Sequence, residues 1–88
     1  MIKEGDFVLI RTYSAGVHFG TLLHRDGQEV HLKDARRLWN WNGALSLSEV
    51  AMKGIKINES KISVPIDEII LTQAVEIIAV HKNSNLPK

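Results

Sequence analysis

The dipeptide Asp26-Gly27 lies between two stretches of the chain that are rich in β-forming residues. Asp-Gly is one of the strongest signals for a two-residue hairpin turn, because both residues tolerate the positive φ angles that such a turn requires. We therefore predict a β-hairpin in which one strand covers residues 17–24 and the next begins at Glu29. This hairpin restricts the chain to folds that contain an antiparallel sheet.

The register of this hairpin decides which side chains reach the core. If Asp26 and Gly27 form the loop, Leu23 pairs with Val30, and the other residues of the two strands pair in the same continuous register. Successive side chains point to opposite faces of a strand, so one face would form the core: Val17, Phe19, Thr21, Leu23, Val30 and Leu32. The other face would hold His18, His24 and His31.

Three further strands follow from alternating or β-forming residues bounded by turn residues. They are expected at residues 7–12, 62–66 and 75–81. Pro65 has no N–H to donate to a ladder, which places its strand at an edge of the sheet.

A helix is predicted over residues 46–53 from the residues at its ends. Ser46 is the expected N-cap, and Glu49, three residues later, completes a capping box. Gly54 can adopt the left-handed conformation that ends a helix.

Five short strands and one inserted helix predict a mainly β (α+β) fold, and so small a sheet buries most apolar surface when it curls. We expect a five-stranded half-open barrel of the SH3-like or Sm-like type. It would form a single domain over residues 1–82, followed by a flexible tail over residues 83–88. Because a domain of this size gains stability by pairing its edge strands with a second copy, we expect a homo-oligomer.

Composition excludes several classes of function. The 88 residues carry a net charge of +1, too little for the broad positive field of a general nucleic-acid binder, so any anion site must be local. There is no cysteine for a disulfide or a thiolate metal site, and no apolar run long enough to cross a membrane. We expect a soluble cytoplasmic protein without a cofactor.

Residues 35–43 form the most distinctive segment, with both tryptophans and two of the four arginines. On an extended chain Arg37, Trp39 and Trp41 would share one surface, and Arg36 would lie on the other. Arginine binds phosphate and tryptophan stacks on bases, so the combination suits a nucleotide or a short single-stranded nucleic acid. An alternative of similar weight is that the tryptophans fill the core and the arginines lie along its rim.

A polar turn at residues 11–18 is the second candidate for ligand binding. It offers a cation, three hydroxyls and a glycine that lets a ligand approach the backbone, and its candidate binding side chains are Arg11, Tyr13, Ser14 and His18. The alternative is a solvated turn whose hydroxyls cap local backbone groups. A binding role gains support if this turn closes over Arg37 and Trp39.

Neither catalysis nor metal binding is supported by a specific motif. Adjacent Asp67 and Glu68 would point to opposite faces of a strand, and Ser14 lacks a nucleophile-elbow motif. The chain has no glycine-rich phosphate loop, and the hairpin histidines are too widely spaced to share an ion. We therefore expect neither an enzyme nor a metal site.

Residues 11–22, 35–41, 43–47 and 64–69 resemble those of a family of small uncharacterised proteins of tailed bacteriophages. The likeness covers nearly the whole chain and implies a phage origin, but no mechanism. Residues 20–22 and 30–35 carry a weaker likeness to Sm-like proteins, from which the long helical segment before Ile62 departs.

Small accessory phage proteins often inhibit a host protein or sequester a nucleotide signal used in bacterial defence. The leading hypothesis is therefore a binding protein that captures a small anionic ligand, such as a nucleotide, in the host cytoplasm without turning it over. Two alternatives stay open: a protein-interaction module that inhibits a host enzyme, and an Sm-like RNA-binding protein.

Overall fold

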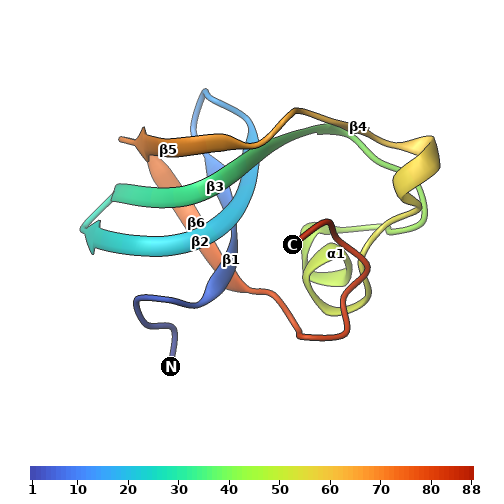
Figure 1. The fold of residues 1–88 in the computed structure, drawn as a ribbon, viewed down its shortest axis with the longest axis horizontal. Coiled ribbons are helices and arrows are strands. Elements are labelled where there is room, and N and C mark those ends of the chain that lie inside the picture. The colour runs from blue at the N-terminus through green and yellow to red at the C-terminus, as the bar shows by residue number, and fades with distance from the viewer.

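The computed structural model describes all 88 residues, which form six strands, one α-helix and one short 3-10 helix. In chain order the elements are β1 (Phe7–Thr12), β2 (Val17–Asp26), β3 (Glu29–Asn40), α1 (Leu47–Lys53), η1 (Ile57–Glu59), β4 (Lys61–Ile62), β5 (Ile66–Leu71) and β6 (Ala74–Ala79). The strands are antiparallel and follow the order β4-β3-β2-β1-β6, with β5 also paired to β3. Figure 1 shows the curled sheet on one side of the molecule and α1 on the other.

A mainly β fold with one inserted helix is confirmed, but the sheet has six strands instead of five and does not close. The strand expected at residues 62–66 is interrupted, because β4 ends at Ile62 and β5 begins at Ile66. Pro65 lies in the break, where its missing N–H costs no ladder hydrogen bond. The two short strands thus pair with different parts of the same edge of β3.

The predicted hairpin register is wrong. Asp26 pairs with Glu29, so the loop consists of Gly27 and Gln28. Gly27 has a φ of 60° at the first central position of the loop, which is where a type II′ turn requires glycine. The Asp-Gly signal therefore marks the turn correctly but places it one residue too early.

The pairing of β2 with β3 also shifts register at two irregularities of the β-bulge kind. A bulge adds one residue to one strand and interrupts the strict alternation of side chains between the two faces. His18 and Leu22 are buried, whereas Thr21 and Leu23, both expected in the core, are only half-buried.

Strand β1 separates two hydrophobic cores, because its side chains are buried on both faces. We name as the first core the cluster that the curled strands enclose: Val8, Ile10, Leu22, Val30, Leu32, Ala35, Leu71 and Ala74. The second core lies between the sheet and α1: Leu9, Phe19, Leu38, Val50, Ala51, Ile55 and Leu86.

Helix α1 begins after Ser46 and ends at Gly54 as predicted, but only the Ser46 half of the predicted capping box forms. Ser46 Oγ accepts a hydrogen bond from the backbone N–H of Glu49 at 3.3 Å. At the other end Gly54 has a φ of 90°, and its N–H donates to the carbonyl of Val50 at 2.9 Å. Because seven residues are too few for a stable isolated helix, the burial of Val50 and Ala51 in the second core must hold α1 in place. No helix of the protein is long and apolar enough to span a membrane.

The C-terminal segment, residues 83–88, is packed against the domain, contrary to the flexible tail that the sequence predicts. Ser84 Oγ donates to the carbonyl of Val50, and Asn85 Nδ2 donates to that of Ile55, both at 2.8 Å. Leu86 is 6% exposed and belongs to the second core. In Figure 1 this segment returns beside α1. The segment was expected to be flexible because its composition is polar. It is nevertheless held by one buried apolar side chain and by two polar side chains that donate hydrogen bonds to backbone carbonyls around the end of α1.

Candidate functional site

Strand β3 carries both arginines of the candidate site and places them on opposite faces of the sheet. Arg37 pairs with His18, which in turn pairs with Ile10 of the first core. Arg36 pairs with Phe19, a member of the second core. The two guanidinium groups therefore belong to different surfaces, as alternation along an extended strand predicts.

His18 orients the side chain of Arg37. Arg37 Nε donates a hydrogen bond to His18 Nε2 at 3.1 Å. The imidazole is 1% exposed, and its burial, together with the nearby charge of Arg37, lowers the pKa of His18 to about 4. The ring is therefore neutral at pH 7, with its proton on Nδ1 because Nε2 is the acceptor. Nδ1 is buried without a partner, an arrangement that costs about 1–3 kcal/mol.

Neither arginine of the segment has a carboxylate partner. The ion pairs of the protein involve other side chains: Lys3 with Asp6, Arg11 with Glu76, His24 with Glu4 and His31 with Glu29. The side chain of Arg36 donates to the carbonyl of Ser63 at 3.4 Å, and that of Arg37 donates to His18. Both arginines are half-buried, so each holds a positive charge partly out of water with no opposite charge beside it.

The two tryptophans have different environments. Trp39 is 63% exposed and lies two residues from Arg37 on β3, at an irregularity in the pairing of β3 with β4. Trp41 follows the end of β3 and packs against the second core. The expectation that Trp41 shares a surface with Arg37 and Trp39 does not hold, because alternation ends with the strand.

Alanine substitution should separate these two roles. Trp41→Ala removes a half-buried indole from the second core and is expected to lower the free energy of unfolding by about 2 kcal/mol. Trp39→Ala removes an exposed ring and should change it by no more than about 0.5 kcal/mol. Urea unfolding of the two variants measures both values, and equal losses would contradict the distinction.

The β1–β2 loop brings Tyr13 to the end of the sheet that holds Trp39. Arg11 pairs with Val17, and Val17 pairs with Leu38, so the loop that follows β1 lies beside the last residues of β3. Tyr13 is 79% exposed and available for contact. The expected proximity of this turn to the Arg37 segment is thus a consequence of the sheet topology.

The other two polar side chains of the turn are engaged within the protein. Arg11 Nε donates to Glu76 Oε1 at 3.1 Å, and Ser14 Oγ donates to Gln73 Oε1 at 3.1 Å. These contacts fix the loop to the start of β6 and leave less capacity for a ligand. We use the name Arg37 surface for the remaining set: Tyr13, Arg37 and Trp39, with His18 beneath them.

Residues 5–86 match the model of a family described as Domain of unknown function (DUF6948). The chain belongs to the DUF6948 family. The match includes every helix and strand and most of the packed C-terminal segment. No curated protein matches the chain. No solved structure matches it either. Since the family description gives neither a function nor a source, the phage resemblance stays a prediction.

This DUF6948 domain also has a pocket of about 480 Å³ that the sequence did not reveal. It is lined by the N-terminal segment, the tip of the β2–β3 hairpin and β6. Because these segments are far apart in the sequence, no local motif could have predicted the pocket. Half of its ten lining residues are hydrophobic, among them Leu22 and Ile77. Its four charged side chains, Lys3, Glu4, Arg25 and Glu76, each contact another group of the protein. The pocket is large enough for a small molecule, and Arg25 is its one cation without a carboxylate partner.

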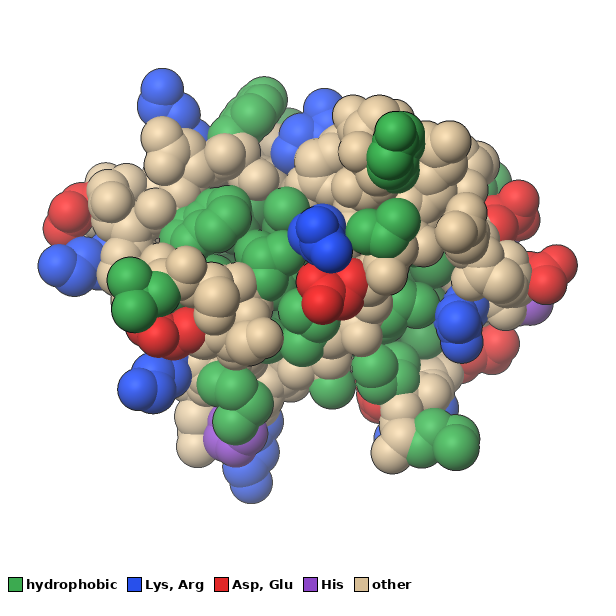
Figure 2. Space-filling model, turned by 180° about the vertical axis from the view of Figure 1, so that it is seen from behind, with side chains coloured by type: hydrophobic (Ala, Val, Ile, Leu, Met, Phe, Trp, Pro, Cys, Tyr) green, Lys and Arg blue, Asp and Glu red, His purple; other side chains and the backbone are tan.

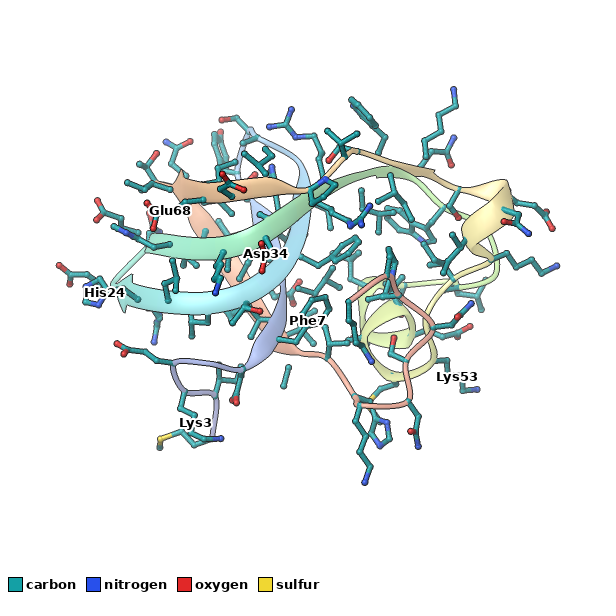
Figure 3. The ribbon with its side chains drawn as sticks, viewed as in Figure 1. Lys3, Phe7, His24, Asp34, Lys53 and Glu68 are labelled. Atoms are coloured by element: carbon teal, nitrogen blue, oxygen red, sulfur yellow. The ribbon has the colours of Figure 1, made fainter.

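Only two of the three hairpin histidines of the DUF6948 domain lie together. His24 and His31 face each other across the hairpin with ring centroids 5.5 Å apart, whereas His18 is buried at the other end of the strand. Figure 3 shows His24 near Glu68 at one end of the molecule and Lys53 at the opposite end. No group of three or more His, Cys, Asp or Glu side chains could hold a metal ion.

Charges are mixed on the surface of the DUF6948 domain. Figure 2, which views the molecule from behind, shows basic, acidic and hydrophobic side chains interspersed on that face, with no continuous basic area. This distribution agrees with the net charge of +1. Attraction of an anion on this protein therefore depends on individual cations such as Arg37.

Proposed function

We propose that the DUF6948 domain binds a small anionic ligand, with a nucleotide as the class that its residues fit best. The observation that supports the proposal is the half-buried guanidinium of Arg37, which has no carboxylate partner and is oriented by a neutral, buried His18. Because Nε is occupied by His18, the two terminal nitrogens of Arg37 remain for a phosphate, which guanidinium binds bidentately.

Two exposed aromatic rings would supply the second half of the site. Trp39 lies two residues after Arg37 near the end of β3, and Tyr13 lies on the loop beside that end of the sheet. Stacking of a base on an aromatic ring contributes about 1–3 kcal/mol and does not depend on the identity of the base. Phosphate on Arg37 and a base on Trp39 or Tyr13 is the arrangement that we favour.

The role of such binding is sequestration. The protein would hold the ligand and release it unchanged, and in a host cytoplasm it would antagonise a defence system that depends on a nucleotide signal. The phage resemblance supports this role by analogy. A homo-oligomer remains part of the proposal, and light scattering coupled to gel filtration measures its mass.

Thermal melting in the presence of cyclic and linear nucleotides tests the proposal. A nucleotide at a hundred times its Kd stabilises the folded state by about 2.7 kcal/mol, which raises the Tm of a domain of this size by about 10 °C or more. Arg37→Gln should abolish the rise. Arg37→Lys should retain only part of the rise in Tm, because lysine keeps the positive charge but cannot donate two parallel hydrogen bonds to one phosphate.

Arg25→Gln serves as the matched control, because Arg25 is an exposed arginine of the hairpin far from Tyr13 and Trp39 in the sheet. It should respond to nucleotide like the wild type. If no nucleotide at about millimolar concentration raises the Tm, binding is weaker than any sequestering protein requires and the proposal fails.

A second candidate is a protein-interaction module that blocks a host enzyme. The 63% exposure of Trp39 favours it, because an exposed tryptophan next to an arginine is a common hot spot of interfaces. The two candidates differ in one outcome: only the nucleotide binder gains thermal stability from a purified small molecule.

A further inference from the structure

Strand β5 has one edge without a partner strand. It pairs with β3 over residues 66–71 and with no other strand. The unpaired N–H and C=O groups along such an edge are a template for another extended chain. Two other strands also have an unpaired edge: β4, whose two residues are too few to guide a strand, and β6, which pairs with β1 alone.

The side chains of β5 divide into a face that anchors the strand and a face that is exposed. Leu71 is buried in the first core and Ile69 packs against it. On the outer face Ile66 and Ile70 remain 45% and 50% exposed. Two large aliphatic side chains are thus exposed to solvent on an edge strand whose other face packs against the first core.

Between the two exposed isoleucines β5 carries an unpaired pair of carboxylates. Asp67 and Glu68 are exposed and take part in no ion pair. The basic residue in register with them is Lys33 of β3, which lies opposite Glu68 without forming an ion pair with it, and residues 62–80 themselves contain no Lys, Arg or His. Figure 3 shows Glu68 on β5 beside the hairpin end of the sheet.

These charges decide which kind of strand fits the edge. In an antiparallel pair of two β5 strands, the carboxylates of one copy would lie close to those of the other, and like charges in opposed positions are destabilising. A basic strand reverses the sign of that interaction. The edge is therefore suited to a foreign basic segment and unsuited to a second copy of itself, so the proposed homo-oligomer must use another surface.

We propose that the free edge of β5 binds an extended segment in which two consecutive basic residues are flanked by apolar ones. In antiparallel pairing the two basic residues lie opposite Glu68 and Asp67, and the flanking apolar residues lie opposite Ile70, Ile69 and Ile66. Backbone hydrogen bonds provide the pairing, and the carboxylates select the charge of the partner. This surface is separate from the Arg37 surface.

A synthetic peptide with the sequence Thr-Val-Val-Lys-Lys-Val-Thr, capped at both ends, is the probe. Added to the full chain, it should shift the backbone amide NMR signals of residues 64–71 in a saturable manner. The same peptide with Glu-Glu in place of Lys-Lys should bind at least about tenfold more weakly. A copy N-methylated on alternate residues should lose binding, because it cannot form the ladder.

Variants of the protein complete the test. Replacing Asp67 and Glu68 together by lysine should weaken the Lys-Lys peptide at least about tenfold and strengthen the Glu-Glu peptide. Glu59→Lys, at an exposed acid on η1, is the control and should leave both affinities unchanged. Circular dichroism confirms that each variant is folded.

Three results would overturn the proposal. They are equal binding of the Lys-Lys and Glu-Glu peptides, signal changes that lie outside β5, and concentration-dependent pairing of the free edge with a second copy. None of them bears on nucleotide binding, which is measured at Arg37 and Trp39.

Discussion

Gly54→Ala is expected to lower the free energy of unfolding by about 3 kcal/mol or more. Gly54 has a φ of 90° and a ψ of −161°, a conformation essentially restricted to glycine and costing about 1–3 kcal/mol for other residues. A Cβ at this position would also collide with the backbone of Asn85. That backbone cannot move away easily, because the N–H of Asn85 donates to the carbonyl of Lys53 at 3.0 Å.

Gly5→Ala is the matched control for this prediction. Gly5 has a φ of 94°, almost the same value, but nothing lies within 4 Å of the position that a Cβ would take. Its replacement should therefore cost only the backbone strain, about 1–2 kcal/mol. Urea unfolding measures both. Similar losses for the two variants would show that the contact between α1 and the C-terminal segment contributes little to stability.

The wild-type protein is expected to lose about 2 kcal/mol of stability between pH 7 and pH 5 because of His18 alone. The pKa of His18 is about 4 in the folded protein, against an ordinary value of 6.5. Between these two values the unfolded chain binds the proton and the folded one does not, so protonation favours unfolding as the pH falls. The contribution is fully present above pH 6.5 and is lost progressively toward pH 4.

His18→Gln isolates this effect, because the amide oxygen of glutamine can accept from Arg37 but does not titrate in this range. The other three histidines are present in both proteins, so they cancel in the comparison. The difference in unfolding free energy between wild type and variant should change by about 2 kcal/mol from pH 7 to pH 5. If the two stability curves run parallel, His18 is not held neutral by the fold.

Local signals predicted those elements whose ends are fixed by their own residues. β1 is found at residues 7–12 as expected, and α1 is set by the Ser46 cap and by Gly54. The hairpin turn was predicted one residue too early, because Asp-Gly is compatible with more than one turn and only pairing over the whole strands selects one.

Bulges explain why the core of the hairpin could not be predicted. Asp34 has a φ of 52° on β3, next to the point where the pairing with β2 shifts register. This left-handed residue breaks the alternation on β3, so that Asp34 and Lys33 are both exposed and Ala35 is buried. Aspartate tolerates this conformation, but the sequence around it looks like an ordinary strand.

The candidate site was predicted in part for the same reasons. Opposite orientations for Arg36 and Arg37 follow directly from strand alternation. The burial of His18 depends on how β1, β2 and β3 curl, and the separation of Trp41 from the Arg37 surface depends on where β3 ends. Both depend on the arrangement of the whole sheet, which the periodicity of side chains within one segment cannot predict.

The central claim is that the Arg37 surface holds a nucleotide with its base against Trp39. It is tested most directly by tryptophan fluorescence in a Trp41→Phe protein, in which Trp39 is the only tryptophan. We expect saturable quenching of Trp39 emission by the nucleotide that gives the largest thermal shift, and no quenching when Arg37→Gln is added. Stacking of a base on the indole would change its emission. The claim is contradicted if the Trp41→Phe protein is folded and its emission does not respond to that nucleotide at any concentration up to about 1 mM.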